Sequence, residues 1–189
     1  MITLKEWLSN ETCLRGGLIS LVVVFMFIGC ASSPKDFDDA IKGPQMILEP
    51  ETIRLGIAKL KDTEIVFKGK GFQPEDSVFI ELLGVKQNDK TVNIPVADGN
   101  VDKSGYFAAK VSILVKVSEL LRAKIGSNEK METIIIVTQP PMPEGVYTAK
   151  ATSMESDLTA ECQIVVKGPS LMDRFKDWIG GLLGKIVKK

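Results

Sequence analysis

The stretch Gly105-Tyr-Phe-Ala-Ala-Lys-Val-Ser-Ile-Leu-Val-Lys-Val117 carries the clearest structural pattern in the sequence. Its apolar side chains recur at every second position, and polar side chains such as Lys110, Ser112 and Lys116 fall between them. This alternation places one set on a single face of a strand, whereas a helix would scatter it around the axis. The stretch therefore predicts one long β-strand. Its buried face would comprise Phe107, Ala109, Val111, Ile113, Val115 and Val117.

Short segments of similar character lie on both sides of this strand and are separated by turn residues. The further predicted strands are 46–48, 53–57, 63–68, 77–83, 91–96, 132–138, 146–152 and 158–166. Segment 118–125 has helical spacing and precedes Gly126, so it predicts a short connecting helix. The whole pattern predicts a mainly β domain over 46–167, of the kind found in sandwiches and barrels.

Three motifs in this domain resemble bacterial immunoglobulin-like domains. They are Gly69-Lys-Gly-Phe72-Gln-Pro-Glu-Asp-Ser-Val78, then Ala97-Asp with Ser104-Gly-Tyr-Phe107, then Pro141 to Glu144 with Gly145-Val-Tyr147-Thr-Ala149. The resemblance implies an antiparallel β-sandwich in which Tyr147 opens a late strand with its ring in the core. The Cys…Trp…Cys pattern of antibody domains is absent, so the resemblance is to the architecture. Because this architecture hosts many unrelated tasks, it does not specify a ligand.

A short apolar segment near the N-terminus predicts export. Residues 18–29 are apolar but fewer than the roughly 20 needed to cross a bilayer, and Arg15 precedes them, as in a secretory signal. The motif Phe27-Ile28-Gly29-Cys30 resembles the lipobox of bacterial lipoproteins, although Phe27 stands where leucine is usual. The resemblance implies that Cys30 is acylated and becomes the first residue of the mature chain. The alternative is an uncleaved signal anchor with Cys30 as an ordinary thiol.

These readings divide the chain into four parts. Residues 1–29 would be a signal peptide, 30–45 a flexible linker, 46–167 the β-sandwich and 168–189 a helical tail. The predicted location is the bacterial cell envelope, with a lipid anchor. Ala31 replaces the aspartate that retains enteric lipoproteins in the inner membrane, so this resemblance favours the periplasmic face of the outer membrane.

The tail predicts an amphipathic helix. Ser170 and Asp173 have the spacing of a capping box, and apolar residues recur three and four positions apart. Basic residues on the opposite side suit a helix that lies in a membrane interface. The predicted membrane- or partner-contact residues are Leu171, Phe175, Trp178, Ile179, Leu182, Lys185, Ile186, Lys188 and Lys189. Two alternatives are docking into a groove of another envelope protein and packing on the chain's own domain.

Composition and cysteine usage narrow the chemistry. The chain has 24 basic and 24 acidic residues, which argues against a general nucleic-acid binder, and no histidine, the commonest general base. Cys13 precedes the predicted cleavage point and Cys30 would be acylated, so Cys162 is expected in the core without an intrachain disulfide. We expect no cofactor and no catalytic site.

One loop has spacing that calcium sites also use. Asp98, Asn100, Asp102 and Ser104 place oxygen-bearing side chains at every second position. However, Lys103 stands where an EF-hand loop has glycine, and the same residues are usual in β-turns. We therefore predict a turn and no metal site.

The resulting functional prediction is a lipid-anchored envelope protein. Its domain would be a structural or binding module, and its tail would make a second contact with membrane or partner. The alternatives are a subunit of an envelope assembly that docks through the tail helix, and a hydrolase, for which no residue pattern indicates a substrate.

Overall fold

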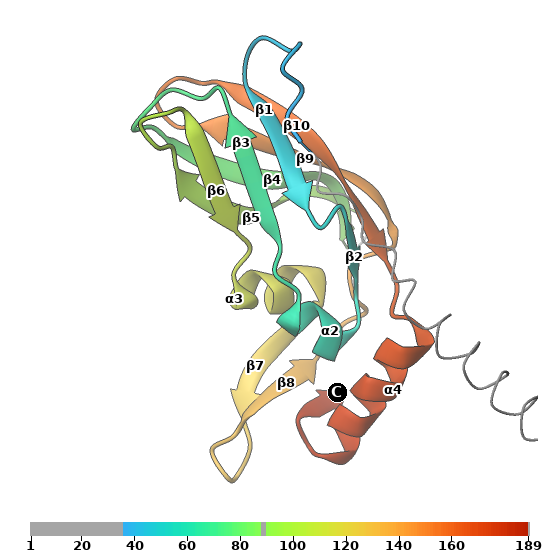
Figure 1. Cartoon of the computed structure of the whole chain (residues 1–189). Coiled ribbons are helices and arrows are strands. Elements are labelled where there is room, and N and C mark those ends of the chain that lie inside the picture. The colour runs from blue at the N-terminus through green and yellow to red at the C-terminus, as the bar shows by residue number, and fades with distance from the viewer. Residues whose placement is uncertain (1–35, 88–89, 189) are drawn as a thin grey trace, which may run out of the picture. The chain divides into compact units, whose positions relative to one another are not determined.

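The computed structural model describes residues 36–87 and 90–188 (Figure 1). The predicted signal peptide, the predicted lipobox with Cys30 and the terminal Lys189 therefore lie outside the described residues. In the described part the chain is mainly β, with three sheets, three α-helices and one π-helix. Residues Lys35–Lys189 form a compact unit. Among the described residues, the buried core of this unit begins at Met46.

Sheets A and B face each other across one hydrophobic core. The strands of sheet A, in order, are β1 (Gln45–Glu49), β3 (Val66–Lys70) and β6 (Tyr106–Lys110). The strands of sheet B, in order, are β2 (Thr52–Arg54), β10 (Thr159–Lys167), β9 (Gly145–Ser153), β4 (Ser77–Gln87) and β5 (Lys90–Asn100). All neighbours are antiparallel except β2 and β10. Leu48 and Phe67 of sheet A and Ile80, Leu82 and Ile164 of sheet B are buried in the shared core.

The described residues also form a third sheet, sheet C. Its order is β11 (Ile186–Lys188), β8 (Thr133–Val137) and β7 (Ala123–Ser127). The helices are α2 (Ile57–Asp62), α3 (Ile113–Val115), the π-helix η1 (Lys116–Leu120) and α4 (Leu171–Leu182). Figure 1 shows α2 and α3 at one end of sheet A, with β7, β8 and α4 beyond them.

The long strand predicted over 105–117 is wrong beyond Lys110. After β6, the Ser112 hydroxyl accepts a hydrogen bond from the Val115 amide at 3.3 Å, which caps α3. Lys116, expected on the solvent face, is buried, and its ammonium group donates to the carbonyls of Lys61 and Thr63 at 3.2 and 2.8 Å. The strand therefore ends at Lys110, and the Lys116 side chain instead supplies hydrogen-bond donors to carbonyl groups at the C-terminal end of α2.

Two other secondary-structure predictions need correction. The helix expected at 118–125 forms earlier as η1, and Ala123–Ser127 pairs with β8 as a strand. The strand expected at 53–57 ends at Arg54, and α2 begins at Ile57. Strands β4 and β5 are longer than predicted and form one antiparallel pair with two register shifts. The remaining predicted strands occur within a few residues of their expected bounds.

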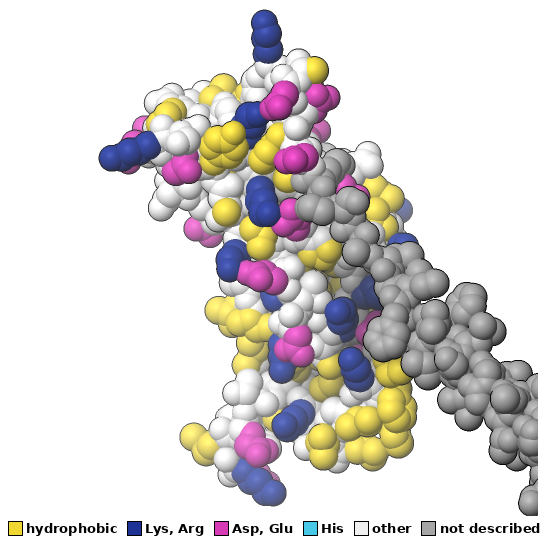
Figure 2. All heavy atoms as spheres, viewed as in Figure 1, with side chains coloured by type: hydrophobic (Ala, Val, Ile, Leu, Met, Phe, Trp, Pro, Cys, Tyr) yellow, Lys and Arg dark blue, Asp and Glu magenta, His cyan; other side chains and the backbone are white. Residues whose placement is uncertain are grey.

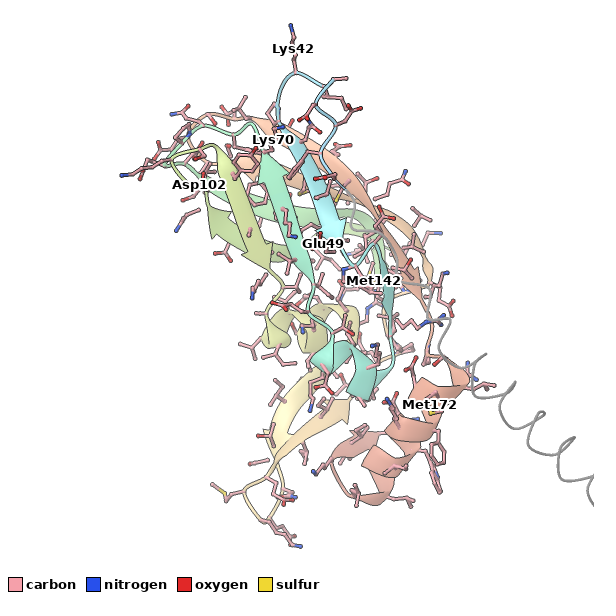
Figure 3. All side chains as sticks on the ribbon, viewed as in Figure 1. Lys42, Glu49, Lys70, Asp102, Met142 and Met172 are labelled. Atoms are coloured by element: carbon pink, nitrogen blue, oxygen red, sulfur yellow. The ribbon has the colours of Figure 1, made fainter. Side chains whose placement is uncertain are left out.

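The described part of the predicted linker contacts sheet A. Asp39 forms a 2.7 Å ion pair with Lys70, which is labelled in Figure 3 at the end of β3. The Phe37 ring meets the Tyr106 ring edge-on, with centroids 6.1 Å apart. These contacts reach back to residue 37, so the chain is attached to the domain before β1 begins.

The predicted tail helix ends earlier than expected. Its capping box is confirmed, because the Ser170 hydroxyl accepts from the Asp173 amide and the Asp173 carboxylate accepts from the Ser170 amide. The helix ends at Leu182 and Gly184 has φ +67°, a left-handed conformation that favours glycine. The chain then returns as β11, which pairs in parallel with β8.

Candidate functional site

Helix α4 packs against its own domain through its acidic side. Asp173 is only 5% exposed and lies against Gly56, where an added Cβ would be 2.6 Å from the Asp173 Cβ. Hydrogen bonds from Ser170 hold the pKa of Asp173 below its usual range despite burial. The Asp177 carboxylate accepts hydrogen bonds from the backbone amides of Ile57 and Ala58 at 3.0 and 2.9 Å. These donors belong to the first turn of α2, so a carboxylate supplied by α4 caps that helix.

The apolar side of α4 consequently faces solvent. Leu171 is 86% exposed and Trp178 59% exposed, and the Phe175 and Trp178 rings stack with centroids 5.8 Å apart. The 3.6-residue period places the exposed apolar side chains on one side of the helix. We define the outer apolar face as Leu171, Met172, Phe175, Trp178, Ile179, Leu182 and Leu183. Figure 2 shows hydrophobic side chains gathered over α4, and Figure 3 labels Met172 there.

Basic side chains border this face. Arg174 and Lys176 are exposed, and the helical period places them on opposite margins of the outer apolar face. Among the described residues, neither has an ion-pair partner. The surface therefore combines exposed hydrocarbon and aromatic groups with basic side chains at its edges.

The structure separates the contact residues predicted for the tail. Leu171, Phe175, Trp178, Ile179 and Leu182 share the outer apolar face. Ile186 does not, because it is half-buried in β11 against Gly180, where a Cβ would be 2.6 Å from the Ile186 Cδ1 atom. Lys185 is exposed just before β11, Lys188 is exposed at the end of β11, and Lys189 lies outside the described residues. The predicted single helical face is therefore wrong beyond Leu182.

An apolar cavity of about 860 Å³ adjoins the inner edge of α4. Leu55 and Ile57 are buried and contribute apolar lining, while Trp178 and Leu182 belong both to this cavity and to the outer apolar face. The other apolar lining residues are Val137, Pro140, Pro141, Pro169 and Ile186. Its polar and glycine lining residues are Thr138, Gln139, Arg174, Asp177, Gly181 and Lys188. This cavity was not predicted from the sequence, because its walls come from four separate segments.

The loop with calcium-like spacing is a turn in the structure. Asp98 and Asn100 belong to β5, and Asn100 accepts a hydrogen bond from the Ser77 hydroxyl at 3.1 Å. The Asp102 carboxylate accepts from the amides of Ser104 and Tyr106 at 2.7 and 3.0 Å, which closes the turn. Over residues 36–87 and 90–188, no group of three or more Cys, Asp or Glu side chains is placed to hold a metal ion.

Asp76 is a buried carboxylate whose structural role was not predicted from the sequence. It accepts hydrogen bonds from the amides of Ser77, Glu155 and Ser156 and from the Ser156 hydroxyl, at 2.6 to 3.1 Å. Burial alone would raise its pKa, but these hydrogen bonds outweigh burial and lower the pKa to about 2. Asp76 therefore ties the start of β4 to the turn between β9 and β10. It is a structural anchor with its acceptor capacity already used.

Comparison with known proteins adds no further assignment. No protein-family model matches the sequence, and no similar sequence was found among curated proteins. In the described part of the chain, no helix combines the length and apolarity needed to span a bilayer. The outer apolar face and the adjoining cavity are therefore interpreted from their own chemistry.

Proposed function

We propose that this chain is a lipid-anchored protein of the bacterial cell envelope, held by an acylated Cys30 and by a second membrane contact through α4. The orientation of α4 carries the proposal. Its acidic side packs against the domain through hydrogen bonds to α2, so its outer apolar face is exposed and free to contact a membrane or a partner. The alanine after Cys30 favours the periplasmic face of the outer membrane.

We also propose that the domain over residues 46–167 is an immunoglobulin-like sandwich. The orders β1-β3-β6 and β10-β9-β4 correspond to strands A-B-E and G-F-C of that architecture. The Tyr147 hydroxyl donates to the Pro143 carbonyl at 2.8 Å, as in the tyrosine corner at the start of strand F. Residues 111–144, which include η1, β7 and β8, would then be an insertion between strands E and F.

The chemistry of α4 favours a lipid interface as the occupant of this surface. Burying one large apolar side chain contributes roughly 1.5 to 3 kcal/mol, and Trp178 and Phe175 suit the boundary between headgroups and acyl chains. Arg174 and Lys176 border the apolar side, where each cation near an anionic membrane contributes about 1 kcal/mol. The domain already holds α4 as a helix, so docking does not require the helix to form first.

A second contact would also explain stable retention. An acyl anchor combined with a basic apolar surface acts as two signals and strengthens retention. The same stacked aromatic pair would also suit a groove on a partner protein, because tryptophan often anchors protein interfaces. This alternative predicts no affinity for lipid alone.

The test uses the unacylated chain of residues 31–189, which contains the compact unit. Trp178 is its only tryptophan, because the other is Trp7. With vesicles of three parts phosphatidylethanolamine to one part phosphatidylglycerol, we expect Trp178 emission to shift to the blue and to be quenched by brominated acyl chains. Serine at Leu171 and Phe175 together should weaken vesicle binding at least about tenfold, given the apolar area lost.

Leu114→Ser is the matched control, because Leu114 is 64% exposed on α3 and far from α4 in sequence. We expect it to bind vesicles as the unmodified chain does. Unchanged Trp178 emission in the presence of vesicles would contradict the membrane contact. Recovery of a single envelope protein through α4 under those conditions would then favour the partner-groove alternative.

A further inference from the structure

We propose that the cavity beside α4 binds one long-chain fatty acid, with its acyl chain between α4 and the 137–141 segment and its carboxylate at Arg174 and Lys188. This site shares Trp178 and Leu182 with the outer apolar face, but its other lining residues lie outside that face. It would take a single amphiphile from solution, whether or not α4 contacts a membrane.

The walls of the cavity suit a hydrocarbon chain. Its volume of about 860 Å³ falls within the usual range of small-molecule sites, which are mostly apolar with a few polar groups. Leu55 and Ile57 are buried parts of the lining, and Val137 and Ile186 are half-buried. Enclosing an acyl chain would remove its methylene groups from unfavourable contact with water.

A peptide is a poorer occupant of the same space, because the walls offer few backbone hydrogen bonds. Strand β8 is paired on both sides, with β7 and with β11. Pro140, Pro141 and Pro169 also line the cavity and lack amide donors. A peptide backbone placed here would leave polar groups without hydrogen-bond partners, which opposes binding.

The charges at the cavity favour an anionic end group. Arg174 and Lys188 line it, are exposed, and have no ion-pair partner among residues 36–87 and 90–188. The third charged lining residue is Asp177, whose carboxylate oxygens accept hydrogen bonds from the backbone amides of Ile57 and Ala58. The two cations are therefore available to a ligand carboxylate, and Arg174 can offer it two parallel N–H donors.

Gly181 gives a direct way to fill the cavity. An added Cβ there meets only the Ile186 carbonyl oxygen, at 3.9 Å, which is an ordinary contact. Gly181→Leu should therefore occupy the space without disturbing α4, and replacing a helical glycine should also strengthen the helix. Gln139→Phe fills the space from the opposite wall and guards against a local effect on the helix.

The binding test uses residues 31–189 in lipid-free buffer with palmitate below its aggregation limit. We expect one palmitate per chain by native mass spectrometry and a saturable change in Trp178 emission. Gly181→Leu and Gln139→Phe should each weaken binding at least tenfold, with far-UV circular dichroism and the melting temperature showing that the fold is kept. The paired change Arg174→Gln and Lys188→Gln should weaken palmitate binding but leave hexadecanol, the uncharged analogue, bound as before.

Two controls separate this site from the membrane contact. Lys176→Gln removes a basic residue that does not line the cavity and should bind palmitate normally. The Leu171 and Phe175 serine variant should lose vesicle binding but keep palmitate. Unsaturable uptake of several palmitates per chain, or equal affinity in the Gly181→Leu and Gln139→Phe variants, would overturn the proposed site whatever the vesicle assay shows.

Discussion

The carboxylate of Asp177 accepts a hydrogen bond at 3.0 Å from the backbone amide of Ile57, a residue 120 positions earlier in the chain. This bond joins α4 to the first turn of α2. It uses the polar side of an amphipathic helix for intramolecular packing. The apolar side, which in most globular proteins faces the core, is thereby turned to solvent.

Loss of this capping carboxylate should destabilise the domain. In Asp177→Ala the amides of Ile57 and Ala58 lose their acceptor, and removal of a helix cap costs about 0.5 to 2 kcal/mol. Urea unfolding should report a free energy of unfolding lower by that amount. Lys176→Ala, one residue away and exposed, is the control and should change stability by less than about 0.5 kcal/mol. Equal effects in both variants would show that Asp177 is not a cap.

The close contact between Gly56 and Asp173 should make Gly56 intolerant of a side chain. Gly56→Ala places a Cβ 2.6 Å from the Asp173 Cβ, which is too near the backbone to move aside cheaply. We expect α4 to be displaced and the domain destabilised by about 1 to 3 kcal/mol, as for other overpacked sites. Faster amide exchange in α4 would report the displacement.

Gly181→Ala is the matched glycine change. The added Cβ makes only an ordinary contact, and the change removes a helical glycine. The free energy of unfolding should therefore rise by up to about 1 kcal/mol. A stable Gly56→Ala variant with unchanged exchange in α4 would contradict the packing described for Asp173.

Asp76 should make the domain sensitive to acid. Its pKa of about 2 lies below the ordinary value of 3.8, so the folded state favours the carboxylate. Its stabilising contribution is therefore present above pH 3.8 and is lost as the pH falls through about 2. Asp76→Asn should be less stable than the parent at neutral pH, and thermal melts should show a smaller loss of stability between pH 5 and pH 2.

The exposed Asp98→Asn variant serves as the control for this measurement. It should follow the parent chain at every pH. If Asp76→Asn loses as much stability on acidification as the parent does, another carboxylate carries the acid sensitivity.

The sequence predicted those features that depend on neighbouring residues. The capping box at Ser170, the mainly β character and most strands in the second half of the domain follow from local spacing. The turn at Asp102 also follows, because its carboxylate bonds to amides two and four residues later. Local chemistry decides such features before any tertiary contact forms.

Features that depend on distant partners were missed. Helix α2 has six residues and no side-chain cap of its own, and its N-terminal amides are satisfied by Asp177. Gly180 permits the close approach of Ile186, and Gly184 permits the turn into β11. The cavity beside α4 could not be predicted, because its walls meet only after these contacts form.

Lys116 provides the last test, because the predicted strand exposes its side chain whereas the structure buries it. Lys116→Met keeps the length of the side chain but leaves the carbonyls of Lys61 and Thr63 without this donor. A hydrogen bond to a charged group contributes about 1.5 to 3 kcal/mol, and urea unfolding should show a loss of that order. The exposed Lys124→Met variant should lose much less.

Burial lowers the pKa of Lys116 below 10.5, so charging it costs more in the folded state than in the unfolded state. The parent should therefore gain stability relative to Lys116→Met as the pH rises toward 10.5, and an unchanged difference would contradict the buried ammonium.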